Sequence, residues 1–233
     1  MKMNPIVEPV ADYQIHPSNE LCELFRSNPF QGVPPQNAQI IIVGNDANYS
    51  PQISAHPFFK VILQYHRDGV TFWKKHGVHH PFLHADYPFS KNKGGVTYHR
   101  NFSKLGLDST FADSVSFVEL LNVPAIGNTG QNKKLFYEMM DTNHLNWLEE
   151  TILTGKKKFV LVNQTLARNI SIIRKRFGAM ARLEPLISGQ KPGVIVYNSD
   201  SVVLFNGYSF SYTVTNNYLA SLSKDMRGFK SAY

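Results

Sequence analysis

A carboxylate and neighbouring amides follow the first buried segment of the chain. Ile40–Val43 is a short apolar run, and directly after it come Gly44, Asn45, Asp46 and Asn48. A carboxylate at the end of a buried strand can orient water, act as a general base or stabilise a developing cation. Asp and Asn also shape turns and cap helices, so a purely structural role for Asp46 stays open.

A second amide follows a second apolar segment. Val115–Leu121 leads directly into Asn122. If both segments are parallel strands, Asp46 and Asn122 share the edge at which open parallel sheets bind ligands. The Asn side chain offers one acceptor and two donors in one plane, which suits the edge of a nucleobase. The alternative is a turn residue ahead of Pro124.

Histidines, aromatic residues and basic residues interleave between Asp68 and Leu107. A long polar and aromatic insertion of this kind is more often functional than structural. Its histidines match no strong zinc signature such as H-E-x-x-H, so we expect no metal site. A metal-dependent hydrolase stays open as an alternative, with these candidate ligands: His76, His79, His80, His84, Asp86 and His99. The basic residues Lys91, Lys93 and Arg100 are candidates for contacts with a DNA backbone.

The remaining pattern predicts the elements that would position these residues. Apolar runs predict strands at 40–43, 115–121 and 159–162 and a C-terminal set around GVIVYN, VVLF and YSFSYTV. Helical patterns lie at 57–66, 136–141, 144–153 and 165–177, and a further helix starts at Ser18. Alternation of strands and helices predicts an α/β fold with a parallel sheet. We expect one domain over 1–233, with a helical and proline-rich lead-in at 1–37 and the insertion at 68–107.

Composition limits the class of protein. The chain has 233 residues, a formal net charge of +7 and one cysteine, Cys22. The charge fits a polyanionic partner or a generic basic surface, and one cysteine excludes an intramolecular disulfide. No apolar run is long enough for a membrane span, and the N-terminus lacks a signal-peptide core. We expect a monomeric cytoplasmic protein without a membrane partner, or a nuclear one in a eukaryote.

The motifs GNDANY and LLNVP resemble those of the uracil-DNA glycosylase superfamily. The resemblance covers roughly residues 38–220 and implies a three-layer α/β/α fold with a central, mainly parallel four-stranded sheet. It implies that Asp46 orients the attacking water and that Asn122 reads the base, with Gly44, Asn45, Tyr49 and Phe58 beside the substrate. No cofactor is implied, and the partner is DNA with a base flipped into the pocket.

Two departures from the family pattern affect this interpretation. Ala47 stands where the family has proline, and no H-P-S-P-L motif occurs near the C-terminus. The best counterpart is VTNNYLAS. In it, Asn216 or Asn217 is expected to donate to the base, and Tyr218 or Leu219 to fill the gap left by the flipped nucleotide.

The sequence therefore predicts a DNA glycosylase that hydrolyses the N-glycosidic bond of uracil or another deaminated or damaged base. Two other hypotheses remain. The first is an inactive nucleic-acid or nucleotide-binding module of the same fold, and the second is the metal-dependent hydrolase. Fold alone does not separate the three.

Overall fold

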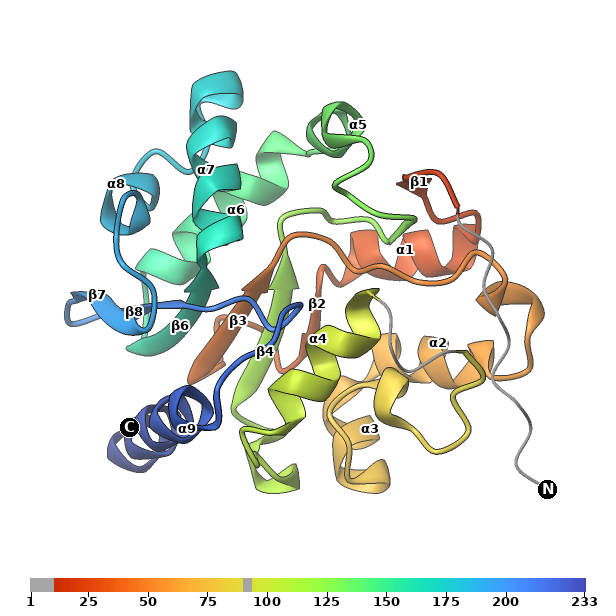
Figure 1. The fold of residues 1–233 in the computed structure, drawn as a ribbon, viewed down its shortest axis with the longest axis horizontal. Helices are drawn as coiled ribbons and strands as arrows, with labels where there is room; N and C mark the ends of the chain where they lie inside the picture. Colours follow the sequence, from red (N-terminus) through yellow and green to blue (C-terminus); the bar gives the residue numbers. More distant parts are fainter. Residues whose placement is uncertain (1–10, 90–93) are drawn as a thin grey trace.

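The computed structural model describes residues 11–89 and 94–233, and its centre is a six-stranded sheet (Figure 1). The strand order is β2-β4-β3-β6-β8-β7. The four inner strands, β4, β3, β6 and β8, are mutually parallel, and the edge strands β2 and β7 are antiparallel to their neighbours. Their bounds are β2 Phe30–Gly32, β3 Ile40–Gly44, β4 Val115–Glu119, β6 Lys158–Asn163, β7 Val194–Asn198 and β8 Val202–Gly207.

The predicted α/β class and mainly parallel sheet are confirmed, but the predicted number of four strands is wrong. The two additional strands lie at the edges. Phe30–Gly32 comes from the proline-rich lead-in, where prolines are tolerated because an edge strand needs only one ladder of hydrogen bonds. Val194–Asn198 forms a hairpin with β8. A separate two-stranded sheet pairs β1 (Gln14–Ile15) with β5 (Ala125–Ile126).

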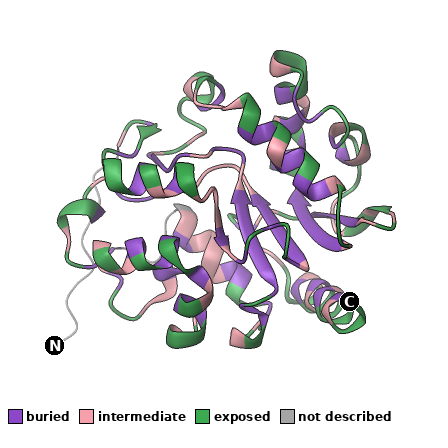
Figure 2. Ribbon diagram, turned by 180° about the vertical axis from the view of Figure 1, so that it is seen from behind, coloured by how far each residue is buried: buried purple, intermediate pink, exposed green. Residues whose placement is uncertain are grey.

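Alternating side chains of the inner strands enter two different cores, because successive residues of a strand point to opposite faces. Ile41 and Val43 pack with helices on one face, whereas Ile40 and Ile42 pack with helices on the other. Figures 1 and 2 show the buried strands between these helices. The first face is covered by α5 (Lys133–Glu138), α6 (Thr142–Leu153), α7 (Gln164–Phe177) and α8 (Glu184–Ile187). The second is covered by α3 (Gly69–His76), α4 (Gly94–Ser103) and α9 (Asn216–Ala232).

A third apolar cluster lies beside the sheet. It joins α1 (Asn19–Ser27) and α2 (Phe59–Arg67) to the segment that follows β3. Ser18 begins α1 as its N-cap, since its hydroxyl accepts from the Leu21 amide at 3.3 Å. Short 3-10 helices at Ile53–Ala55 (η1), Pro81–Leu83 (η2) and Ser109–Phe111 (η3) complete the chain.

Two local predictions differ from the structure. The second strand ends at Glu119, not at Leu121, and YSFSYTV is a loop instead of a strand. The VTNNYL segment starts α9, with Thr215 as N-cap accepting from the Tyr218 amide at 3.3 Å. Serine- and threonine-rich segments that follow a strand favour such caps, and apolar spacing after Thr215 favours the helix.

Residues 68–107 were predicted as an insertion, and its described part contains two helices, α3 and α4, which pack on the sheet. Asp68 begins α3 by accepting from the Thr71 amide at 2.9 Å, and Gly77 ends it in the left-handed conformation. Within the described residues, no helix combines the length and the apolar character that a bilayer crossing needs.

Candidate functional site

A cavity of about 800 Å³ lies at the edge of the sheet where the parallel strands end. The last residue of β3, Gly44, and the last residue of β4, Glu119, belong to its wall, as does Asn163 at the end of β6. Loops and α4 supply the remaining walls through residues 45–51, 95–99, 127–131 and 209–212. Ligands bind at this edge in open parallel sheets because the strands deliver loops and side chains to one place.

Asp46 is held in this cavity by two hydroxyl groups. Tyr13 donates to its Oδ2 at 3.2 Å, and Thr129 donates to Oδ1 and Oδ2 at 3.1 and 3.0 Å. The backbone on either side is also fixed, because Ala125 donates to the Ala47 carbonyl at 2.8 Å and accepts from the Tyr49 amide at 3.0 Å. Asp46 is therefore a positioned carboxylate and not a free turn residue.

The loop that carries Thr129 approaches β1 closely at Gly127. Gly127 has a φ of +77°, and a Cβ there would lie 2.7 Å from the Ala11 carbonyl oxygen. Only glycine combines this backbone conformation with this approach. The Asn48 amide adds a hydrogen bond of 2.5 Å to the Gly127 carbonyl. These contacts bring Tyr13 and Thr129 to the same carboxylate.

Glu119 is the second acid of the cavity. Its carboxyl lies over the backbone of Gly44, where an added Cβ would come within 1.9 Å of Oε2. No hydrogen bond reaches this carboxyl from the described residues, and burial followed by the nearby Asp46 charge raises its pKa from 4.5 to about 8. Glu119 is therefore mainly protonated at neutral pH.

The carboxyl groups of Asp46 and Glu119 differ in the hydrogen bonds that they receive. Burial raises the pKa of Asp46, but the hydrogen bonds from Thr129 and Tyr13 lower it, and Glu119 has no such donors. The neighbouring negative charges also disfavour ionisation of both at once. We conclude that Asp46 ionises first and that Glu119 keeps its proton. Separation of two carboxyl groups in this way assigns a base and an acid to one site.

Aromatic rings line the rest of the cavity. Tyr49 is buried, and its hydroxyl lies 2.7 Å from His66 Nε2. His80 and His99 stack with ring centroids 3.6 Å apart, and burial lowers the pKa of both. Tyr98 also belongs to the wall, and burial raises its pKa. These rings are therefore uncharged at neutral pH, and they suit a flat ligand.

Four predicted site residues come together here, namely Gly44, Asn45, Asp46 and Tyr49. Asn45 accepts from the Asn169 amide at 2.8 Å, which fixes its side chain. Phe58 and Asn122 do not line the cavity. Phe58 packs against Tyr87 and His84 with centroids 5.6 and 5.5 Å away.

Asn122 lies outside the cavity because β4 ends earlier than predicted. Its amide donates to Asp141 Oδ2 at 3.1 Å, and Asp141 is the N-cap of α6. The side chain is half-buried in this contact. The edge position that was predicted for Asn122 is occupied by Glu119, three residues earlier.

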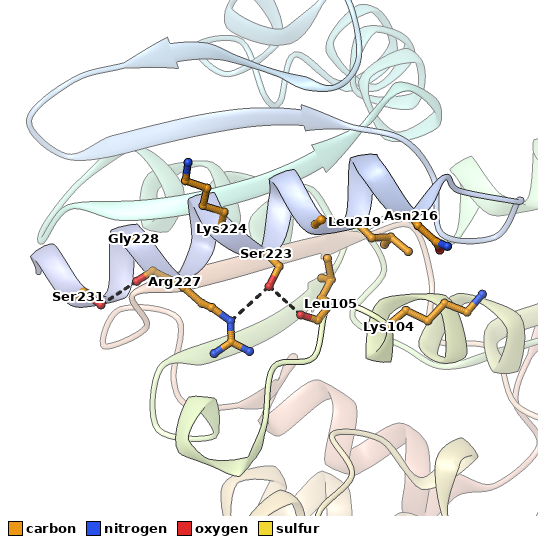
Figure 3. A pocket seen from close by; sticks show the side chains of 10 residues that line it. Lys104, Leu105, Asn216, Leu219, Ser223, Lys224, Arg227, Gly228 and Ser231 are labelled. Carbon is orange, nitrogen blue, oxygen red and sulfur yellow. Dashed lines mark hydrogen bonds between the residues drawn. The ribbon is translucent and has the colours of Figure 1, made fainter.

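The four residues predicted from VTNNYL also lie away from this cavity. Asn216 and Leu219 line a separate groove along α9, together with the basic residues Lys104, Lys224 and Arg227 (Figure 3). Leu219 is only 4% exposed and packs in the core, so it is not placed to enter DNA. Asn217 is exposed on the same first turn. The Tyr218 hydroxyl accepts from the Tyr208 amide at 3.1 Å, and burial raises the pKa of Tyr218 to about 12.

Three basic residues were predicted to contact DNA. Lys91 and Lys93 lie outside the described residues. Arg100 is half-buried on α4, directly after the cavity residue His99.

The histidines of the insertion form a packed aromatic cluster. His79 Nε2 lies 3.1 Å from His99 Nδ1, and the His79 ring stacks on Phe117 at 5.5 Å. Burial lowers the pKa of His79 to about 3. Across residues 11–89 and 94–233, no group of three His, Cys, Asp or Glu side chains has the geometry to hold a metal ion.

Comparison with known proteins gives no family for this chain: no family model, no curated protein and no solved structure matches it. The site is therefore interpreted from its own geometry.

Several cavity residues were missed from the sequence. Glu119 was hidden inside the apolar run VSFVELL, and Thr129 follows no apolar run that would have drawn attention to it. Ser209, Ser211 and Tyr212 follow β8, whose C-terminal end lies at the same edge as that of β3. For Ser209, Ser211 and Tyr212, the available signal was their position shortly after the apolar run VVLF.

The two hydroxyl donors allow a direct test at Asp46. Tyr13→Phe combined with Thr129→Val removes the hydrogen bonds that stabilise its ionised form. Because hydrogen bonds to charged groups contribute about 1.5–3 kcal/mol each, we expect the pKa of Asp46 to rise above its wild-type value. Carbon-13 NMR of labelled aspartate carboxyl groups measures this pKa. Tyr13→Phe combined with Thr129→Ser keeps one hydroxyl and should give a smaller rise, whereas an unchanged pKa in both variants would show that the hydroxyls do not control Asp46.

Proposed function

We propose that this protein is a DNA glycosylase that hydrolyses the N-glycosidic bond of uracil or another deaminated or damaged base. The observation that carries this proposal is the position of Asp46. Its carboxylate is fixed by Tyr13 and Thr129 at the carboxyl edge of a parallel sheet, inside a cavity lined by aromatic rings. The finer fold assignment, a uracil-DNA glycosylase-like arrangement of β4, β3, β6 and β8, is part of the proposal.

The chemistry requires few groups. As the N-glycosidic bond breaks, C1′ of the sugar becomes oxocarbenium-like. An ionised Asp46 stabilises this cation and orients the water that attacks it. The departing base takes up negative charge, which a neutral hydrogen-bond donor beside it stabilises. Glu119 is such a donor while it keeps its proton.

The cavity also fits the substrate. A base within a duplex is unreachable and must be flipped out. A volume of about 800 Å³ lies within the common range of ligand pockets, about 300–1,000 Å³. Tyr98 offers a half-buried ring in the wall, and base–aromatic stacking is worth about 1–3 kcal/mol. The net charge of +7 favours a polyanionic partner.

Tyr212 is the cavity-lining side chain that is best placed to contact the DNA around a flipped base. It is 71% exposed, yet its backbone is fixed, since the Asn101 amide donates to the carbonyls of Phe210 and Tyr212 at 2.8 and 3.0 Å. An exposed ring on a fixed loop can stack on a base or fill the gap left by a flipped nucleotide. Tyr212 takes over the role that the sequence assigned to Tyr218 or Leu219.

We expect Tyr212→Ala to weaken binding of duplex DNA by about 5- to 100-fold, which corresponds to loss of one base–aromatic stack of about 1–3 kcal/mol. Fluorescence anisotropy with a labelled duplex measures the affinity. The matched control is Tyr233→Ala, because Tyr233 is 63% exposed and lies beside Lys157, at the opposite end of the sheet. Equal effects of the two substitutions would remove Tyr212 from the DNA interface.

A nucleic-acid-binding module is the second candidate function. The observation that favours it is the position of Asn216 and Asn217, the predicted leaving-group donors, which lie outside the cavity. Base release from oligonucleotides carrying uracil, hypoxanthine, xanthine or mismatched thymine, with a chelator present, separates the candidates. Release supports the glycosylase without a metal requirement. Salt-sensitive binding without release supports the module, and release only with added metal supports a metal-dependent hydrolase.

A further inference from the structure

A buried polar side chain in the wall of the cavity lacks a partner. Gln31 is 5% exposed, and its Nε2 has no hydrogen-bond partner in the structure as described. The half-buried Glu119 carboxyl lines the same cavity. An unpaired buried polar group is costly, so the Gln31 amide in one wall with this carboxyl indicates a ligand that completes it.

The register of the sheet brings these two groups to one face. Gln31 of β2 pairs with Phe117 of β4, and Glu119 follows two residues later on the same face of that strand. Such diagonal neighbours lie roughly 7–8 Å apart, within reach of long side chains. Gly44 of β3 pairs with Glu119 and, having no side chain, leaves the space that the carboxyl occupies.

We infer that Gln31 and Glu119 form a subsite that reads the lactam edge of a nucleobase, a carbonyl beside a ring N–H. This inference rests on the proposed function and names the residues that select its substrate. The Gln31 amide and the protonated Glu119 each offer a donor to the carbonyl oxygen, which has two lone pairs. The other Glu119 oxygen accepts from the ring N–H. Deamination creates this edge, because it replaces an exocyclic amine with a carbonyl and adds a ring N–H.

The same subsite disfavours bases that carry an amine at this position. In cytosine or adenine the amine would point its own donors at the Gln31 amide. A site built to hydrogen-bond one pattern rejects another strongly, because its buried groups are then left unpaired. Protonated Glu119 can pair with either edge, so the Gln31 amide, with Nε2 toward the base, is the group that separates the deaminated base from its parent.

The protonation of Glu119 depends on every group that faces it. Asp46 follows β3, Tyr98 and His99 come from α4, Tyr65 comes from α2, and Tyr49 and His80 come from loops. The tyrosines and histidines are neutral near pH 7, since burial raises the pKa of the former and lowers that of the latter. Asp46 supplies the only charge among these groups, and it favours the protonated form of Glu119.

Binding of free bases to the full chain tests the subsite without DNA. The probes are uracil and hypoxanthine, with cytosine and adenine as controls, titrated by calorimetry at pH 6.5 and pH 9. We expect wild type to bind uracil at least about tenfold more tightly than cytosine at pH 6.5. With the pKa of Glu119 at about 8, we expect uracil affinity to fall about tenfold at pH 9, where about one molecule in ten keeps the proton.

Two variants test whether Gln31 and Glu119 form the subsite. Glu119→Gln keeps a neutral donor and acceptor, so it should bind uracil at both pH values without the tenfold difference. Gln31→Leu should bind uracil about tenfold more weakly than wild type at both pH values. Asn122→Ala, outside the cavity, should behave as wild type. Circular dichroism melting of each variant verifies folding, and the isosteric Glu119→Gln keeps the test valid if Gln31→Leu does not fold.

The outcomes separate this inference from the proposed function. No binding of free base, equal binding of cytosine, or a wild-type pH dependence that Glu119→Gln retains would overturn the lactam subsite. Base release from DNA that continues unchanged in a folded Gln31→Leu variant would overturn it also, and would leave the glycosylase standing. Lactam-selective, Glu119-dependent binding without any release from DNA would support the subsite and contradict the glycosylase.

Discussion

Replacement of Asp46 by Asn is expected to slow base release by about 10²- to 10⁴-fold, the usual contribution of a positioned general base. The amide keeps the shape of the carboxylate and one oxygen that accepts from Thr129, while its NH2 group donates to the Tyr13 hydroxyl in place of accepting from it. It has no negative charge, so it neither stabilises the oxocarbenium-like sugar nor accepts a proton from water. Single-turnover release from a lesion-containing oligonucleotide measures the effect.

The same variant should bind DNA and fold as wild type. Asp46 lies within the cavity, and its replacement by a neutral amide removes none of the positive charge that attracts the DNA backbone. We expect affinity within about threefold of wild type. The matched control is Asp141→Asn, because Asp141 caps α6 outside the cavity and should leave the rate unchanged. Comparable loss of rate in both variants would mean that Asp46 has no special role.

The second large effect concerns stability and pH. The pKa of Glu119 is raised from 4.5 to about 8, so the folded state keeps a proton that the unfolded state loses. Stability from this group is complete below pH 4.5 and is lost as pH rises to about 8, because the folded state binds more protons. At about 1.4 kcal/mol per pKa unit, the loss amounts to roughly 3–5 kcal/mol.

The stability contributed by the buried histidines changes with pH in the opposite direction. Burial lowers the pKa of His66 and of His79 to about 3, so the unfolded state binds more protons below pH 6.5. Their contribution therefore rises with pH up to about 6.5 and is constant above it. The Glu119 effect is isolated by subtracting the curve of Glu119→Gln from that of wild type.

Urea unfolding at closely spaced pH values between 4 and 9 measures both curves. The difference should fall steadily between pH 4.5 and 8, with wild type losing stability relative to Glu119→Gln. Glu138→Gln serves as the control, since Glu138 is exposed beside Lys134 on α5. A flat difference curve would show that Glu119 ionises normally and would also remove its role as a neutral donor.

Much of the fold was predictable, because the inner strands are short apolar runs without competing interpretations. Ile40–Gly44 and Lys158–Asn163 were found within one or two residues. The edge strand Phe30–Gly32 was missed, since prolines and polar residues surround it and only pairing with β4 makes it a strand. The α9 helix was missed because its first turn, with Asn216 and Asn217, has the composition of a loop.

The site was predictable only in part. Asp46 was identified because it follows an apolar run immediately and its strand ends where the run ends. Glu119 was not, because two leucines after it extend the apolar run past the true strand end. Asn122 was placed at the edge by that same extension. Contacts between distant segments, such as Thr129 with Asp46, depend on the close approach at Gly127 and leave no local pattern.

The most direct test of the central claim is the product balance of one turnover. Wild-type protein is incubated with a duplex that carries a single uracil or hypoxanthine, and free base and abasic sites are counted in the same sample. We expect equal amounts of both, an intact phosphodiester backbone, and product from Asp46→Asn that forms at least about 10²-fold more slowly. A cut backbone without free base, or product that forms equally in Asp46→Asn, would contradict the central claim.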